Sequence, residues 1–145
     1  MKYDEFHRLV MKQIEAIIEI ASDGTFSVYC KDEIFSGSGG TITEAKEDMQ
    51  AQMSFYKRTA IEEGFKYPEW MDEEYSIQYT TDAISLLKYF VGSGLFSLAG
   101  LEKLTGINQK QLWAYVNGTK PRKAQSERIV SGFRSLRNNL NSIFA

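Results

Sequence analysis

Residues 97 to 118 of this chain read SLAGLEKLTGINQKQLWAYVNG and predict two short helices joined by a tight turn. Gly106 would turn the chain, and Ile107 would fill the gap between the two helices. Asn108 would cap the second helix, because a side-chain oxygen at that position accepts a hydrogen bond from the first turn. The apolar residues at helical spacing are Leu98, Leu101, Leu104, Leu112 and Val116. The pattern limits this part of the chain to a compact helical arrangement.

One further helix is predicted on each side of this pattern. The first would begin after Asp82 and end at the glycines of residues 92 to 94, and the second would span residues 124 to 143. Their apolar stripes consist of Ile84, Leu87 and Val91 in the first helix and of Ile129, Phe133, Leu136 and Leu140 in the second. We therefore expect an all-α domain with its own core.

The N-terminal part of the chain shows the alternation of apolar and polar residues that is typical of β-strands. Residues 13 to 20 and 25 to 30 alternate in this way, and the Asp23-Gly24 pair between them favours a tight turn, so they predict a hairpin. A third short strand at residues 33 to 36 is weakly indicated.

A long helix is predicted at residues 42 to 63. The glycines and serines of residues 36 to 40 predict a flexible loop before it, and Thr41 with Glu44 fits a capping box at its start. Gly64 would end the helix. Its apolar positions recur at intervals of three and four residues and are Ile42, Ala45, Met49, Met53, Tyr56 and Ala60.

A last strand at residues 75 to 79 completes the N-terminal part. The fold class expected from these elements is α+β. Residues 1 to 80 would form a small antiparallel sheet with one long helix, and residues 81 to 145 would form the all-α domain.

The net charge differs between the two expected domains. Residues 1 to 80 hold 8 Lys and Arg against 16 Asp and Glu, whereas residues 81 to 145 hold 9 against 3. The net charges are therefore −8 and +6. Clustered cations are typical of nucleic-acid binding, although two oppositely charged surfaces could also serve solubility or docking.

The exposed side of the helix after the predicted turn carries amides and a cation. Amides can hydrogen-bond to adenine edges, and cations can contact guanine or phosphate. Base contacts are expected from Gln109, Lys110 and Gln111. Contacts with the DNA backbone are expected from Asn108, Asn117, Lys120 and Arg122. Trp113 is either packed or a DNA contact, and packing is favoured because aromatic side chains are more often buried.

Residues 97 to 140 resemble the helix-turn-helix domains of phage repressors. The resemblance rests on Gly106-Ile107-Asn108 at the turn, Gln109 at the start of the second helix, and Asn117-Gly118 followed by Lys120-Pro121 at its exit. It implies binding to double-stranded operator DNA as a homodimer or higher homo-oligomer. Many members of that family place alanine four residues before the turn glycine, where this chain has Glu102. Ala99 and Gly100 would then supply the close helix packing.

Residues 13 to 79 resemble the HicB antitoxin domain. The motifs are Asp23-Gly24 in the hairpin, Tyr29 at the strand end and Thr41-x-x-Glu44-Ala45 at the helix start. The resemblance implies a curtailed ribonuclease-H-like fold. It also implies a type II antitoxin that neutralises a small basic HicA-like ribonuclease toxin and represses its own operon. The link at residues 31 to 40 lacks the Pro-Asp pair of that family. Candidate apolar anchors for such a partner are aromatic residues such as Tyr29, Tyr67, Trp70 and Tyr75, although aromatic side chains are more often packed within the protein.

The alternative within the binding class is a stand-alone transcriptional regulator whose N-terminal domain senses a ligand or dimerises. An enzyme is not expected. A magnesium-dependent nuclease would draw on Glu19, Asp23 and Asp32, but these residues fit a strand face, a turn and a loop.

A metal site and a membrane-spanning segment are also not expected. The single cysteine, Cys30, and the single histidine, His7, leave no metal site built on these residue types, and we expect no cofactor. Cys30 would be a buried strand residue, and His7 would lie at the surface. No apolar run is long enough to span a bilayer, and the N-terminus lacks the apolar core of a signal peptide. We therefore expect a cytoplasmic protein.

Overall fold

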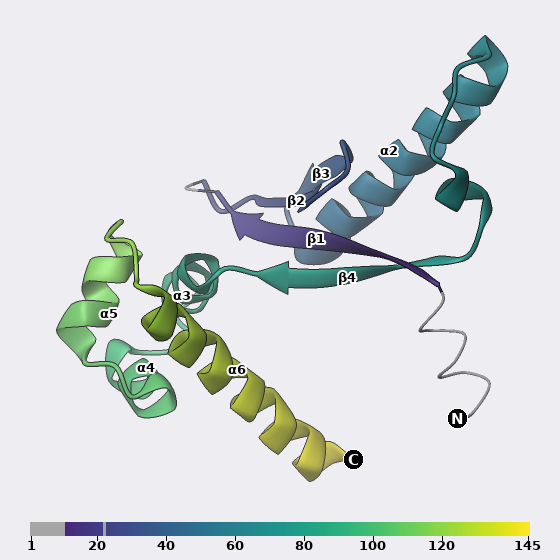
Figure 1. Ribbon diagram of the computed structural model, residues 1–145. Helices are drawn as coiled ribbons and strands as arrows, with labels where there is room; N and C mark the ends of the chain where they lie inside the picture. The colour runs from purple at the N-terminus through teal and green to yellow at the C-terminus, as the bar shows by residue number, and fades with distance from the viewer. Residues whose placement is uncertain (1–10, 22) are drawn as a thin grey trace. The chain divides into compact units, whose positions relative to one another are not determined.

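The computed structural model describes residues 11–21 and 23–145 (Figure 1). The chain divides into two compact units, Met1–Thr80 and Thr81–Ala145, called here the N-terminal and the C-terminal unit. Each unit is described by itself. The expectation for His7 lies outside the described residues.

The N-terminal unit is an α+β structure built on one four-stranded sheet. The strands follow the order β3-β2-β1-β4 across the sheet. A long helix, α2, lies between β3 and β4 in sequence, and a short 3-10 helix precedes β4. The elements are β1 (Lys12–Ile20), β2 (Phe26–Cys30), β3 (Ser36–Gly39), α2 (Ile42–Glu63), η1 (Glu69–Asp72) and β4 (Tyr75–Thr81).

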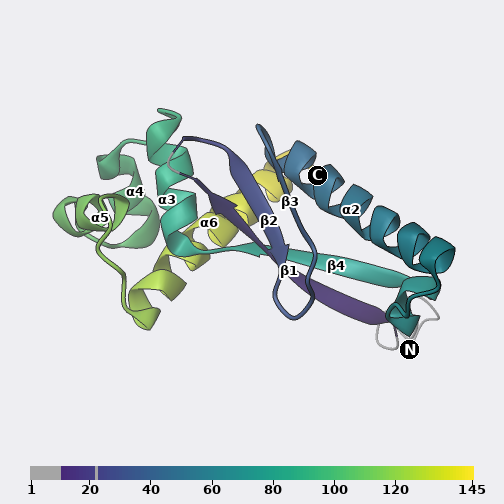
Figure 2. The ribbon, with the colours of Figure 1, turned by 90° about the horizontal axis from the view of Figure 1, so that it is seen from above.

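The sheet is mixed, so the prediction of a purely antiparallel sheet is wrong. β1 pairs antiparallel with β2, and β2 pairs antiparallel with β3. β4 hydrogen-bonds to the other edge of β1, and both strands run in the same direction in Figures 1 and 2. The physical reason is the long connection through α2, because a helical crossover returns the chain parallel to the strand that it left.

Helix α2 confirms the predicted bounds and the predicted buried face. The Thr41 hydroxyl accepts a hydrogen bond from the Glu44 amide at its start, and Gly64 ends it in the left-handed conformation with φ of 76°. Four of the six predicted apolar positions are buried, namely Ala45, Met49, Met53 and Ala60. They pack on the face of the sheet that carries Ile14, Ala16, Val28 and Cys30.

The glycine- and serine-rich segment forms strand β3, so the prediction of a flexible loop there is wrong. A side chain at Gly37 would contact the Met49 backbone nitrogen, and its Cβ would lie 2.6 Å from the Ala45 carbonyl oxygen. The missing side chain therefore lets α2 lie directly against the strand. Packing against the helix and pairing with β2 stabilise an extended conformation that the residue types alone do not favour.

The C-terminal unit consists of four helices. They are α3 (Ala83–Gly92), α4 (Leu98–Thr105), α5 (Gln109–Val116) and α6 (Lys123–Phe144). Asp82 caps α3 by accepting a hydrogen bond from the Ser85 amide at 2.6 Å. The core consists of Ala83, Leu87, Leu101, Ile107, Leu112, Tyr115 and Ile129. No helix within the described part of the chain is both long and apolar enough to cross a membrane.

Two packing predictions for this unit need correction. Tyr115 is buried in the core, whereas Val116 is only half-buried and packs against it. Leu140 is 44% exposed, because the second half of α6 extends beyond the helices that cover its first half (Figure 1). The apolar stripe of α6 is therefore buried only around Ile129 and Phe133.

We expect the substitution Gly37→Ala to lower the free energy of unfolding of the N-terminal unit by about 1 to 3 kcal/mol, because the new Cβ would push on the backbone of α2. Urea unfolding followed by Trp70 fluorescence in a Trp113→Phe background measures this unit alone. Gly40→Ala is the matched control, since its Cβ would meet only the flexible Glu44 carboxylate at 3.3 Å. Equal unfolding midpoints for the two variants would contradict the expectation.

Candidate nucleic-acid interface

The turn between α4 and α5 has the predicted conformation and is stabilised by two buried side chains. Gly106 adopts φ of 75°, and its amide donates to the Glu102 carbonyl at 2.8 Å. Ile107 is buried in the core, which confirms its predicted role as a plug. The sequence reading did not identify Thr105. Its buried hydroxyl donates to the Leu101 carbonyl at 2.7 Å and accepts from the Ile107 amide at 3.2 Å.

The first turn of α5 presents three polar side chains to solvent. Gln109, Lys110 and Gln111 are all exposed, and they follow one another directly at the start of the helix. The free amides at a helix N-terminus carry partial positive charge, and Lys110 adds a full one. This end of α5 is therefore suited to meet a negatively charged surface.

Gln109 is held in one orientation by α4. Its Nε2 donates to the Glu102 Oε2 at 3.1 Å. A carboxylate can only accept, so the amide nitrogen must face Glu102 and the amide oxygen is left to accept from another group. Glu102, where many phage repressors have alanine, thus contacts Gln109, one of the predicted base-reading residues.

Asn108 and Asn117 cap the two ends of α5. The Asn108 Oδ1 accepts from the Gln111 amide at 2.9 Å, and the Asn117 Nδ2 donates to the Trp113 carbonyl at 2.8 Å. The predicted cap at Asn108 is confirmed. Contact of either side chain with a DNA backbone stays a prediction.

Lys120 and Arg122 lie with Gln111 around one hollow between α5 and the start of α6. The hollow has a volume of about 520 Å³ and is also lined by Tyr115 and Gln125. Gln125 donates to the Gln111 Oε1 at 3.4 Å, which links the two helices. The structure therefore brings two of the predicted phosphate contacts next to one predicted base contact.

Trp113 is not a core residue, so the favoured packing interpretation is wrong. Its side chain is 56% exposed. The buried aromatic residue of α5 is Tyr115, two positions later. Trp113 follows Gln109 by four residues, which places both on the same face of the helix.

Arg128 and Gly132 of α6 lie against the turn and against α4. The Arg128 Nη2 donates to the Gly106 carbonyl at 2.9 Å, and its Nη1 donates to the Gln125 side chain at 3.1 Å. A Cβ at Gly132 would lie 2.7 Å from the Leu104 carbonyl oxygen, so this glycine allows α6 to approach α4. Ala99 is exposed, and a Cβ at Gly100 would meet no atom of α5 within 4 Å, so these two residues do not provide the close packing expected between α4 and α5.

The four aromatic residues predicted as partner anchors make contacts within the N-terminal unit. The Trp70 ring lies edge-on to Tyr75 at 5.1 Å and to Phe35 at 6.4 Å between ring centroids. The hydroxyl groups of Tyr29 and Tyr67 donate to Glu19 at 2.9 Å and to Asp72 at 3.0 Å. All four are half-buried. Among the residues of this unit that the structure describes, the exposed large apolar ones are instead Ile34, Phe55, Ile61 and Phe65.

Two of the three acidic residues considered for a nuclease, Glu19 and Asp23, have local structural roles. The Asp23 carboxylate accepts from the Thr25 hydroxyl at 2.7 Å, which lowers the pKa of Asp23, and Glu19 accepts from Tyr29. Cys30 is buried, and this burial raises the pKa of its thiol. Residues 11–21 and 23–145 contain no group of three His, Cys, Asp or Glu side chains placed to hold a metal ion.

Comparison of the chain with protein-family models, with curated proteins and with solved structures found no match. The functional proposals therefore rest on the geometry of the two units.

We expect Asn108→Ala to lower the free energy of unfolding of the C-terminal unit by about 1 kcal/mol, because the Gln111 amide loses its acceptor. Asn108→Ser keeps an acceptor oxygen and should retain most of the stability. Trp113 fluorescence during urea unfolding, in a Trp70→Phe background, reports on this unit. If the Ala and Ser variants unfold at the same urea concentration, the cap does not contribute.

Proposed function

We propose that the C-terminal unit is a helix-turn-helix DNA-binding domain and that the chain represses transcription from an operator. The observation that carries this proposal is the exposed first turn of α5, which follows a left-handed glycine turn between two short helices. A helix with a polar first turn can enter the major groove and reach base edges. The unit's 9 cations against 3 acidic residues favour a polyanionic partner.

The exposed residues divide into two roles within this proposal. Gln109, Lys110 and Gln111 would read base edges, and Trp113 on the same face would contact sugar or a thymine methyl group. Lys120 and Arg122, beside Gln111, would contact phosphates. Operators of this type are two-fold symmetric, so we infer that the chain binds as a homodimer.

We expect the double variant Gln109→Ala, Lys110→Ala to lose its preference for the DNA upstream of its own gene over a scrambled duplex. Each well-placed base contact provides about 1 to 3 kcal/mol of discrimination. Fluorescence anisotropy with both duplexes at moderate salt measures the preference. Lys120→Ala should instead weaken binding to both duplexes alike. It should also lower the slope of log K against log salt concentration by about one.

Arg137→Ala is the matched control for these variants. Arg137 is an exposed cation of the same unit, but it lies on the second half of α6, away from α5 (Figure 1). Its loss should leave sequence preference unchanged. An unchanged footprint for the double variant at moderate salt would reject the assignment of α5 as the reading helix.

We further propose that the N-terminal unit has the curtailed ribonuclease-H-like fold of HicB antitoxins and binds a small basic ribonuclease toxin. The element order of three strands, a helix and a strand supports this proposal. The net charge of −8 also supports it, because an acidic surface can cover the RNA-binding surface of a ribonuclease. The chain would then be a type II antitoxin and autorepressor, acting in the cytoplasm.

We expect the chain to form a stable complex with a small basic protein encoded beside its gene. Co-expression followed by size-exclusion chromatography should show co-elution, and the complex should weaken as salt is raised because opposite charges attract across the interface. The isolated toxin should arrest growth, and the full chain should restore it. DNA binding without any such complex would favour a stand-alone regulator whose N-terminal unit senses a ligand or dimerises.

A further inference from the structure

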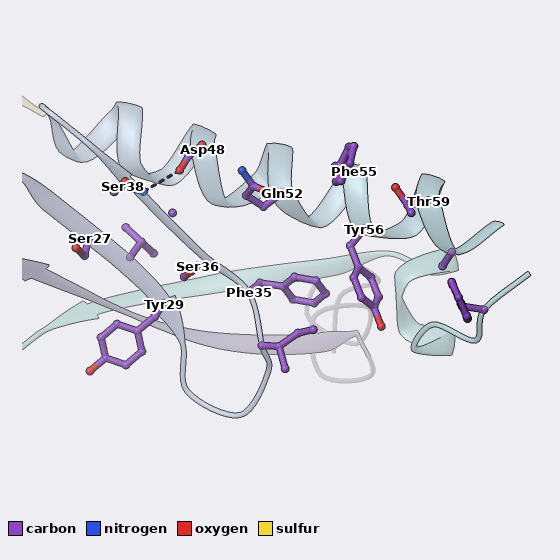
Figure 3. A pocket seen from close by; sticks show the side chains of 15 residues that line it. Ser27, Tyr29, Phe35, Ser36, Ser38, Asp48, Gln52, Phe55, Tyr56 and Thr59 are labelled. Atoms are coloured by element: carbon purple, nitrogen blue, oxygen red, sulfur yellow. Dashed lines mark hydrogen bonds between the residues drawn. The ribbon is translucent and has the colours of Figure 1, made fainter. Parts of the chain in front are cut away.

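A groove runs between β3 and α2 in the N-terminal unit (Figure 3). Its volume is about 770 Å³, and Phe35 and Tyr56 lie between its two sides. Asp48, Gln52, Phe55 and Thr59 recur at helical spacing and line the α2 side. Three of the four large apolar side chains exposed in the described part of this unit line the groove, namely Ile34, Phe55 and Phe65. Such clustering of exposed apolar residues marks an interaction site.

The other side of the groove is the edge of the sheet. β3 is the last strand on that side, and no further strand pairs with it within residues 11–21 and 23–145. The Ser38 amide points outwards and donates to the Asp48 carboxylate at 2.9 Å. Alternate residues of a strand direct their backbone groups to the same edge, so Ser36 also faces outwards. Ser36 is exposed, and its backbone can therefore pair with an incoming strand.

The small residues of β3 leave room for such a strand. Ser36 and Ser38 have the only side chains along β3, since the other two residues are glycines. Asp48 closes the groove at the Ser38 end, so pairing is directed to the Ser36 end, next to Ile34 and Phe55. Backbone pairing would provide affinity there, and the apolar pocket would select a side chain.

The charges around the groove favour a basic occupant. Its described lining residues include the Asp48 carboxylate and no lysine or arginine. In the sequence, Asp32 and Glu33 precede Ile34, and Glu62 and Glu63 precede Phe65 at the other end. Two nearby lysines are paired, Lys31 with Glu15 at 3.4 Å and Lys57 with Asp72 at 2.9 Å. The Arg58 guanidinium lies 5.6 Å from the centroid of the Phe55 ring, and Lys66 follows Phe65, but the five carboxylates around the groove outnumber these two cations. A second copy of this acidic unit would bring the same carboxylates and be repelled.

We propose that this groove binds an extended, basic segment of the partner, which adds as a strand beside β3 and places an apolar side chain against Phe55 and Phe65. This proposal rests on the partner-binding function proposed above for the N-terminal unit.

The test uses the full chain and the small basic protein encoded beside its gene. Phe55→Ser should weaken the complex by on the order of 10- to 100-fold in Kd, because it removes a central apolar anchor. Ile61→Ser is the matched control, since Ile61 lies on the same helix and is 60% exposed, against 56% for Phe55, but does not line the groove. It should bind like the wild type. Phe65→Ser, beyond the end of α2, should repeat the effect of Phe55→Ser.

Amide hydrogen exchange tests the added strand. Exchange at Ser36 should slow by at least about tenfold in the complex if its backbone N–H pairs with the partner. Urea unfolding followed by Trp70 fluorescence in a Trp113→Phe background checks that the N-terminal unit of each variant is folded.

The outcomes separate this proposal from the one on which it rests. If the wild-type chain forms no complex, both proposals fail. If Phe55→Ser and Phe65→Ser bind as tightly as the wild type, or Ile61→Ser is equally weakened, the groove is not the docking site while partner binding stands. If Phe55→Ser instead abolishes self-association of the chain, the occupant is a second copy and the proposal is overturned.

Discussion

In each unit a long helix lies against the backbone of a neighbouring element at a glycine, and the remaining packing depends on that contact. Gly37 brings β3 against the backbone of α2, and Gly132 brings α6 against the carbonyl of Leu104. Dispersion attraction falls steeply with distance, so a shift by the width of one methyl group weakens every contact behind it. Fully buried residues such as Met49 and Ile129 keep their contacts because these two positions carry no side chain.

Local sequence patterns were sufficient to predict the elements whose formation depends on near neighbours. The bounds of α2 follow from its capping residues and from apolar positions at helical spacing, all of which lie within the helix or next to it. The plug at Ile107, the cap at Asn108 and the start of α3 after Asp82 were predictable for the same reason. Residues 109 to 111 are exposed as expected, because they occupy the polar face of a helix with a clear apolar face.

Features decided by distant contacts were not predictable in this way. The segment Ser-Gly-Ser-Gly has little strand propensity, and only α2 and β2 together hold it extended as β3. Trp113 and Tyr115 are both aromatic and close in sequence, and the positions of α3 and α4, which pack on α5, decide which one is buried. The parallel placement of β4 likewise depends on the path of the crossover through α2. The groove was missed because Ile34, Phe55 and Phe65 are separated in sequence and meet only in the fold.

The hydrogen bond between Glu102 and Gln109 has a thermodynamic consequence for any ligand that α5 meets. A long amide side chain loses rotational freedom when it binds, at a cost of about 0.5 to 1.5 kcal/mol for a side chain of this kind. The hydrogen bond to Glu102 restricts Gln109 before any ligand binds, so part of that entropy is lost on folding. The same carboxylate repels phosphate oxygens, which restricts the paths that a nucleic-acid backbone can follow past the start of α5. Glu102 thus orients the Gln109 side chain for a contact and disfavours phosphate contacts beside it.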